Sequence, residues 1–163
     1  MRMILISFIL FLSSIVFAAE IPNLFYVDNG IWRSGLLDKT NIDTLKTLGI
    51  KTIISMKTNP IQVEFEQNWS RKNKIKFIHI GMWLIPRVDE HKIWNVYERI
   101  ISEPKPLLVH CTYGKDRTGV AVAMYRILEQ DWSYQDTIGE MDSFGFSPFY
   151  DYWKGFLRGL STH

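Results

Sequence analysis

The sequence predicts a single α/β domain in which a central, mostly parallel sheet is flanked by helices. Short apolar or β-branched runs alternate with helical stretches, the pattern of parallel strands joined by crossover helices. At 163 residues the chain is long enough for one domain with a hydrophobic core and too short for two. Its composition, 47% hydrophobic and 22% charged, is that of an ordinary globular protein.

Residues 1–19 have the pattern of a secretory signal peptide. Arg2 supplies the positive charge, an apolar stretch follows, and cleavage is expected after Ala18 or Ala19. The alternative is an uncleaved membrane anchor, but the apolar run is shorter than the ~20 residues that a span needs. We therefore expect an exported, periplasmic or secreted, monomeric domain over residues 20–163 that has no stable membrane association after cleavage.

The strands are expected from β-branched and apolar runs. After a short irregular or strand-like entry, they are predicted at residues 31–35, 50–56, 76–80 and 107–110. The last of these runs is apolar up to its final residue and should lie inside the sheet.

The helices are expected from capping residues and apolar spacing. Thr40 or Asn41 can cap a helix that presents Ile42, Leu45 and Leu48 and ends at Gly49. Asn59 and Pro60 predict the start of a second helix, whose apolar stripe is Ile61, Phe65 and Trp69. Further helices are predicted from residue 90 to the prolines at 104 and 106, at 118–129, and within 132–160, where Gly145 and Pro148 mark a break. The helix at 118–129 is apolar almost all round and should be buried.

Charge and cysteine content narrow the function classes. The net charge of +2, without a run of basic residues, argues against a nucleic-acid partner. One cysteine cannot form a disulfide within the chain, so Cys111 is a reactive residue, a buried filler or a partner in an intermolecular bridge. The histidines at 79, 91 and 163 lack metal-ligand spacing, and we expect no metal.

The stretch 109–119 joins the lone cysteine to a glycine and an arginine, between an apolar strand and an apolar helix. A loop that leaves a strand and opens a helix turns backbone N–H groups inward, where they bind phosphate oxygens. Gly114 permits tight curvature, and the planar fork of Arg117 can hold two phosphate oxygens at once. Cys111 then lies at the base of a bowl, with its sulfur toward the phosphorus.

The same surroundings favour the thiolate, which is the attacking form of a cysteine. Backbone N–H groups, the helix N-terminus, Arg117 and Lys115 all stabilise an anion. His110 is expected to orient the loop from behind, and the Thr118 hydroxyl can hydrogen-bond the thiolate. The positions expected to bind phosphate are Thr112, Tyr113, Gly114, Lys115 and Thr118.

His110-Cys111, five residues and then Arg117-Thr118 resembles the signature of the cysteine-dependent protein-tyrosine-phosphatase superfamily. The run from Gly114 to Gly119 is similar to that of small dual-specificity, lipid-directed and inositol-phosphate-directed members, including phytases of this class. The resemblance implies hydrolysis of phosphomonoesters through a phosphocysteine intermediate, without a cofactor. It also implies a basic residue carried toward the pocket, usually Arg, at the position of Lys57.

The leaving group needs an acid, and two aspartates compete for the role. Similar proteins commonly use an Asp on a loop before the last strand, where Asp89 is available, although the usual Trp-Pro-Asp pattern is absent. Others draw the acid from the phosphate loop, where Asp116 stands. The structural alternatives are a helix cap for Asp89 and a loop brace for Asp116, and the choice stays open at this point.

For the substrate, the sequence favours a multiply phosphorylated small molecule such as an inositol polyphosphate. The lysine-bearing loop resembles inositide-directed relatives, and an exported enzyme meets few phosphotyrosine proteins of its own cell. Lys57, Arg33 and Arg87 are each expected as surface charges, although several at one sheet end would suit a polyanion. The alternatives are a protein tyrosine or dual-specificity phosphatase and, from another class, a non-catalytic phospholigand-binding module. The aromatic residues between 144 and 156 are expected to pack helices.

Overall fold

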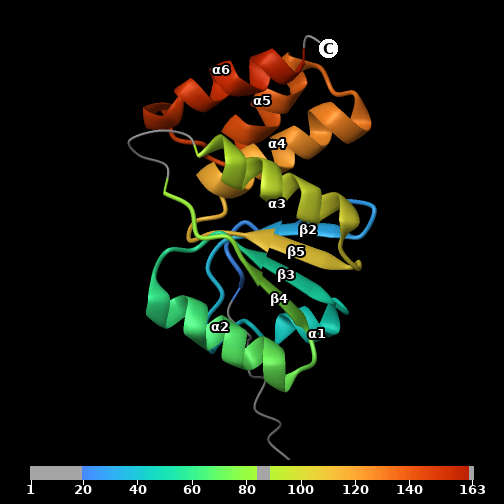
Figure 1. Ribbon diagram of the computed structural model, residues 1–163, viewed down its shortest axis with the longest axis vertical. Coiled ribbons are helices and arrows are strands. Elements are labelled where there is room, and N and C mark those ends of the chain that lie inside the picture. The colour runs from blue at the N-terminus through green and yellow to red at the C-terminus, as the bar shows by residue number, and fades with distance from the viewer. Residues whose placement is uncertain (1–19, 84–88, 162–163) are drawn as a thin grey trace, which may run out of the picture.

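A computed structural model describes residues 20–83 and 89–161 (Figure 1). The predicted signal peptide and its cleavage site lie outside the described residues, and so does Arg87. Among the helices of the two described ranges, none is long and apolar enough to cross a membrane.

Five strands form one mostly parallel sheet in the order β1-β2-β5-β3-β4, which confirms the predicted fold class. They are β1 (Phe25–Asp28), β2 (Ile31–Ser34), β3 (Thr52–Ser55), β4 (Lys76–His79) and β5 (Leu107–His110). Only the β1–β2 pair is antiparallel among these strands. The apolar β5 is buried along its whole length at the centre of the sheet, between β2 and β3.

The helices α1 (Thr44–Thr47) and α2 (Pro60–Lys72) cover one face of the sheet, at the bottom of Figure 1. The core on this side gathers Leu45 of α1 with Ile53 and Leu108 of the strands. Asn59 caps α2 as predicted, because its side chain accepts hydrogen bonds from the N–H groups of the first turn, and Pro60 follows it.

The helices α3 (Glu90–Ser102) and α4 (Asp116–Gln130) cover the other face, and α5 (Tyr134–Ser143) and α6 (Tyr152–Leu160) pack on the outer side of α4 (Figure 1). A short 3-10 helix, η1 (Pro148–Tyr150), joins the last two. Residues 118–127 of α4 are all buried, as the sequence predicts. The larger core lies here, and Trp153 and Phe146 are buried in it.

The structure corrects two details of the helix predictions. The first helix starts two or three residues later than expected, with Asp43 at its N-cap position. Asn41 does not cap it, because its buried side chain accepts from the Asp38 N–H and donates to the Leu36 carbonyl, holding a turn. In α2, Phe65 and Trp69 pack against the core as predicted, but Ile61 is 77% exposed. Ile61 lies in the first turn of α2.

Candidate active site

The loop between β5 and α4 lies at the carboxyl end of the parallel strands, where open α/β sheets bind their ligands. Cys111 follows the last residue of β5 and is 2% exposed. Gly114 has a φ of +71°, and a Cβ there would fall 2.6 Å from the Gly35 nitrogen. The loop therefore passes against the end of β2 at a distance that only glycine permits.

Arg117, in the first turn of α4, is held by carbonyl groups from two neighbouring strand ends. Its Nη1 donates to the carbonyl of Met56, after β3, at 2.8 Å and to that of Met82, after β4, at 3.2 Å. Its Nη2 donates to the Thr112 hydroxyl in the loop at 3.3 Å. These contacts orient the guanidinium across the loop and leave further N–H donors for a ligand.

Arg33 is not a surface charge, which corrects the expectation for this residue. Its side chain is fully buried, and Nη2 donates to the Gly114 carbonyl at 2.8 Å. The guanidinium carbon lies 3.7 Å from the centre of the Phe144 ring. Burial lowers the pKa of Arg33 to about 10, although Glu140 and Cys111 act to raise it. A cation is thus enclosed directly behind the loop.

Lys57 is also buried instead of lying on the surface. Its Nζ contacts Glu66 Oε1 of α2 at 3.0 Å, and both side chains are fully enclosed. Glu66 Oε2 accepts from the Ser55 hydroxyl at 2.9 Å and lies 3.2 Å from His110 Nε2. The sequence analysis missed Glu66. The only sequence feature that points to Glu66 is its spacing from Ser70, four residues later, which places both polar residues on one face of α2; both are buried.

The two candidate acids are both held by local hydrogen bonds. Asp116 Oδ1 accepts from the backbone N–H of Ser147 at 2.9 Å, so the start of α4 is braced against the loop that follows α5. Asp89 caps α3 by accepting from the N–H of Lys92 at 3.2 Å. Each contact is the structural alternative considered for that residue, and neither contact excludes a second role.

The remaining loop residues differ in exposure. Thr118 is buried, and its hydroxyl contacts the Ser34 carbonyl at 3.5 Å. Tyr113 is 66% exposed, while Lys115 is exposed and lies against Gly145. Of the basic residues expected at this sheet end, Lys115 is the exposed one within the described ranges, since Arg33 and Lys57 are buried.

Exposed apolar side chains lie near the same loop. Trp83, 71% exposed, follows the residue whose carbonyl holds Arg117. Phe149, also 71% exposed, is two residues from Ser147, which binds Asp116. An apolar hollow of about 370 Å³ begins at Leu36, directly after Gly35, which lies against Gly114 of the loop. Its lining residues are Leu36, Leu37, Asp38, Lys39, Ile61, Gln62 and Phe65. The aromatic residues between 144 and 156 are thus only partly devoted to helix packing.

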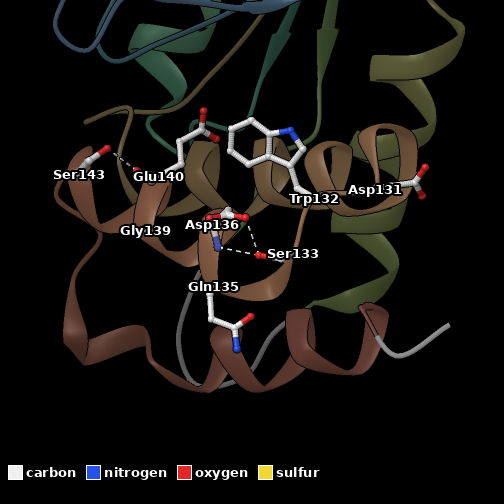
Figure 2. Close-up of a pocket in the computed structure, with 8 residues that line it drawn as sticks. All are labelled: Asp131, Trp132, Ser133, Gln135, Asp136, Gly139, Glu140 and Ser143. Carbon is white, nitrogen blue, oxygen red and sulfur yellow. Dashed lines mark hydrogen bonds between the residues drawn. The ribbon is translucent and has the colours of Figure 1, made fainter.

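A cavity of about 730 Å³ lies at the other end of α4, around the turn into α5 (Figure 2). Asp131, Asp136 and Glu140 give it an acidic lining, which does not suit an anionic ligand. Ser133 donates to one carboxylate oxygen of Asp136 at 2.7 Å and caps α5. Within residues 20–83 and 89–161, no group of three or more His, Cys, Asp or Glu side chains could hold a metal ion.

Known proteins share this fold and sequence pattern. The dual specificity protein phosphatase TpbA of Pseudomonas aeruginosa (strain UCBPP-PA14) is 28% identical over 126 residues, which cover 76% of this chain and 55% of TpbA. The inositol diphosphatase DSP2 of Arabidopsis thaliana is 30% identical over 161 residues, covering 75% of this chain and 62% of DSP2. The chain thus spans between about half and two thirds of these curated relatives.

Solved structures agree with this likeness. The catalytic domain of the PP-IP phosphatase SIW14 from Saccharomyces cerevisiae superposes with a TM-score of 0.74 at 25% identity, over 86% of this chain and 87% of that one. The crystal structure of TpbA gives a TM-score of 0.72 at 25% identity, over 91% and 96%. Residues 21–157 match the sequence model of the tyrosine phosphatase family, in agreement with the resemblance seen in the sequence. The chain belongs to the tyrosine phosphatase family.

Proposed function

We propose that this protein hydrolyses phosphomonoesters through a phosphocysteine intermediate. The observation that carries the proposal is the joint geometry of the loop: a lone, buried cysteine at a strand end, and an arginine six residues later that is oriented by carbonyls of two other strand ends. Family membership supports the same chemistry. We also propose that the protein is exported. N-terminal sequencing of the protein from the producing cell tests this, and we expect the mature sequence to begin after residue 18 or 19.

The reaction has two steps. The Cys111 thiolate attacks phosphorus, the bond from phosphorus to the ester oxygen breaks, and a carboxylic acid gives its proton to the leaving alcohol. The same group, now a carboxylate, takes a proton from water, which attacks the phosphocysteine and releases phosphate and the thiolate. Arg117 and the loop N–H groups hold the equatorial oxygens, on which negative charge is spread in both transition states.

Asp116 and Asp89 remain the two candidates for the acid. Asp116 is adjacent to Arg117, whereas Asp89 lies at the end of a segment that separates β4 from α3. Asp116→Asn and Asp89→Asn, compared on a substrate with a poor leaving group and on an aryl phosphate with a good one, separate them. The variant that loses turnover only with the poor leaving group has lost the acid, because a good leaving group departs without a proton.

An inositol polyphosphate is the first candidate substrate. The exposed Lys115 at the loop can contact a second phosphate, and the relatives include a named inositol diphosphatase. An ammonium group is a flexible point charge and suits a phosphate that varies in position. We expect Lys115→Met to lower kcat/KM for this substrate more than for one with a single phosphate.

A phosphotyrosine protein is the second candidate. It is favoured by the exposed aromatic side chains of Trp83, Tyr113 and Phe149 near the loop and by the neighbouring apolar hollow. Aromatic rings contribute contact area to a bound aryl group, while a small polyanion gains nothing from them. The burial of Arg33 and Lys57 supports this candidate too, since it removes two cations from the reach of a polyanion.

The deciding experiment assays phosphate release by the purified protein from inositol hexakisphosphate and from a phosphotyrosine peptide, beside Cys111→Ser. We expect the variant to lose at least about a thousandfold in kcat, and an acid-quenched wild-type reaction to carry phosphate on Cys111. Equal turnover by the variant would contradict the covalent mechanism. Binding of phosphate without turnover in the wild type would instead identify a phospholigand-binding module.

A further inference from the structure

The buried carboxylate of Glu66 connects the strand end that orients Arg117 to the strand end that carries the nucleophile. It belongs to α2, on the face of the sheet opposite α4, and is remote from the loop in sequence. Its contacts are Ser55 Oγ at 2.9 Å, Lys57 Nζ at 3.0 Å and His110 Nε2 at 3.2 Å. The side chains of Glu66, Lys57 and His110 are all fully buried.

Two of these contacts flank the carbonyl that holds Arg117. Ser55 and Lys57 stand on either side of Met56, whose carbonyl accepts from Arg117 Nη1 at 2.8 Å. The Lys57 carbonyl is itself bound by the His79 ring at 2.8 Å, so the chain is held here from both sides. The orientation of the Met56 carbonyl therefore depends on where Glu66 holds the residues around it.

The third contact reaches the nucleophile. His110 directly precedes Cys111, and its carbonyl accepts from the Met56 N–H at 3.0 Å. Glu66 thus contacts His110 directly and holds Met56, the residue that pairs with His110, through its two chain neighbours Ser55 and Lys57. These buried contacts form a closed ring and resist displacement of the two strand ends, because each polar group would lose its partner in a water-free site.

The groups around Glu66 favour its charged form. Burial alone would raise the pKa of Glu66, but His110 and Lys57 outweigh it and hold the pKa below its usual value. The carboxylate therefore favours its ionised form, which accepts hydrogen bonds from Ser55 and Lys57, with the His110 ring 3.2 Å away.

On this geometry, and resting on the proposed phosphatase function, we infer that Glu66 is a positioning residue for catalysis. It sets the distance between the Arg117 guanidinium and the Cys111 sulfur without touching the substrate. A displacement of about 1 Å between two catalytic groups costs up to ~100-fold in rate. The loss falls on kcat and on the binding of transition-state analogues, while the KM for the ground-state substrate changes little.

Glu66→Gln alone leaves the Lys57 ammonium buried without its counter-ion and risks unfolding. The test therefore uses the double variant Lys57→Met/Glu66→Gln, which removes both charges and keeps similar volumes. Glu103→Gln is the matched control: Glu103 is 7% exposed and paired with Lys76 and Arg99, but it lies at the opposite end of the sheet. Melting temperature, kcat, KM and orthovanadate affinity are measured for each protein.

We expect the double variant to fold and to lose about tenfold or more in both kcat and vanadate affinity, with KM within about twofold of wild type. The control should keep wild-type kcat and vanadate affinity. A double variant that melts lower but retains both values per folded molecule would reduce Glu66 to a structural role and overturn the inference. Failure of the proposed function looks different: the wild type itself would turn over neither substrate.

Discussion

Gly114→Ala gives the sharpest prediction about the loop, because its effect can be worked out from backbone geometry. The residue has a φ of +71°, and an added Cβ would fall 2.6 Å from the Gly35 nitrogen and 2.7 and 2.8 Å from the Ser34 carbonyl carbon and oxygen. All three neighbours are backbone atoms, which cannot move aside as a flexible side chain can.

Two costs therefore add. A left-handed alanine costs about 1 to 2 kcal/mol, and overpacking costs about 1 to 3 kcal/mol. We expect a loss of about 2 to 5 kcal/mol in the free energy of unfolding, which lowers the melting temperature by about 5 to 20 °C in a domain of this size. Since the displaced backbone belongs to the proposed anion-binding loop, vanadate affinity should fall by about tenfold or more.

Two other glycines serve as controls in the same calorimetric and vanadate-binding assays. Gly145 also has a positive φ, +81°, but the nearest atoms to a Cβ there belong to the flexible end of the Lys115 side chain, at 3.3 Å. Its alanine variant should lose only the conformational cost. Gly155 lies within α6 with nothing within 4 Å, so Gly155→Ala should be neutral or stabilising by up to about 1 kcal/mol. A Gly114→Ala protein that has the same melting temperature as Gly145→Ala and keeps wild-type vanadate affinity would refute the reasoning.

Three further predictions follow from the buried and exposed charges. Arg33→Met should keep a melting temperature close to wild type, because Arg33 Nε and Nη1 lack hydrogen-bond acceptors among the described residues. The variant should nevertheless lower kcat/KM about tenfold, because it releases the Gly114 carbonyl, and an unchanged kcat/KM would contradict this. The pKa of Glu66 is depressed in the folded state, so its charge stabilises the fold above pH ~4.5, and this stability is lost as the pH falls through the folded-state pKa. The stabilities of the wild type and of Lys57→Met/Glu66→Gln, measured by acid unfolding, should therefore converge below the folded-state pKa of Glu66, and a constant difference between them would disprove this. Lys115→Met should reduce kcat/KM for inositol hexakisphosphate at least about fivefold more than kcat/KM for a phosphotyrosine peptide. Competition assays at two salt concentrations measure this difference, and an equal loss for the two substrates would count against a second phosphate contact.

Features of the fold that depend on nearby residues were predictable from the sequence. The cap at Asn59, the buried helix after the loop and the α/β alternation were all predictable, because each depends on neighbours within a few positions. The helix near Asn41 was predicted too long, since the same side chain can hold a turn as readily as it can cap a helix. Ile61 fits the apolar spacing, but it is 77% exposed, because spacing alone does not say where along a helix its apolar face is covered.

The nature of the loop was determined by the sequence alone. The order of the lone cysteine, Gly114 and Arg117 between an apolar strand and an apolar helix is a local pattern, and we propose that backbone geometry makes it an anion-binding bowl wherever the strand is placed. What lies behind and around that bowl was decided only by tertiary structure. Arg33 meets Gly114 across 81 residues and Asp116 meets Ser147 across 31, while Glu66 reaches His110 because β3 pairs in parallel with β5. A charge has the same sequence signal on a surface as in a core, and only the packing of distant strands and helices determines whether water or another side chain is its partner.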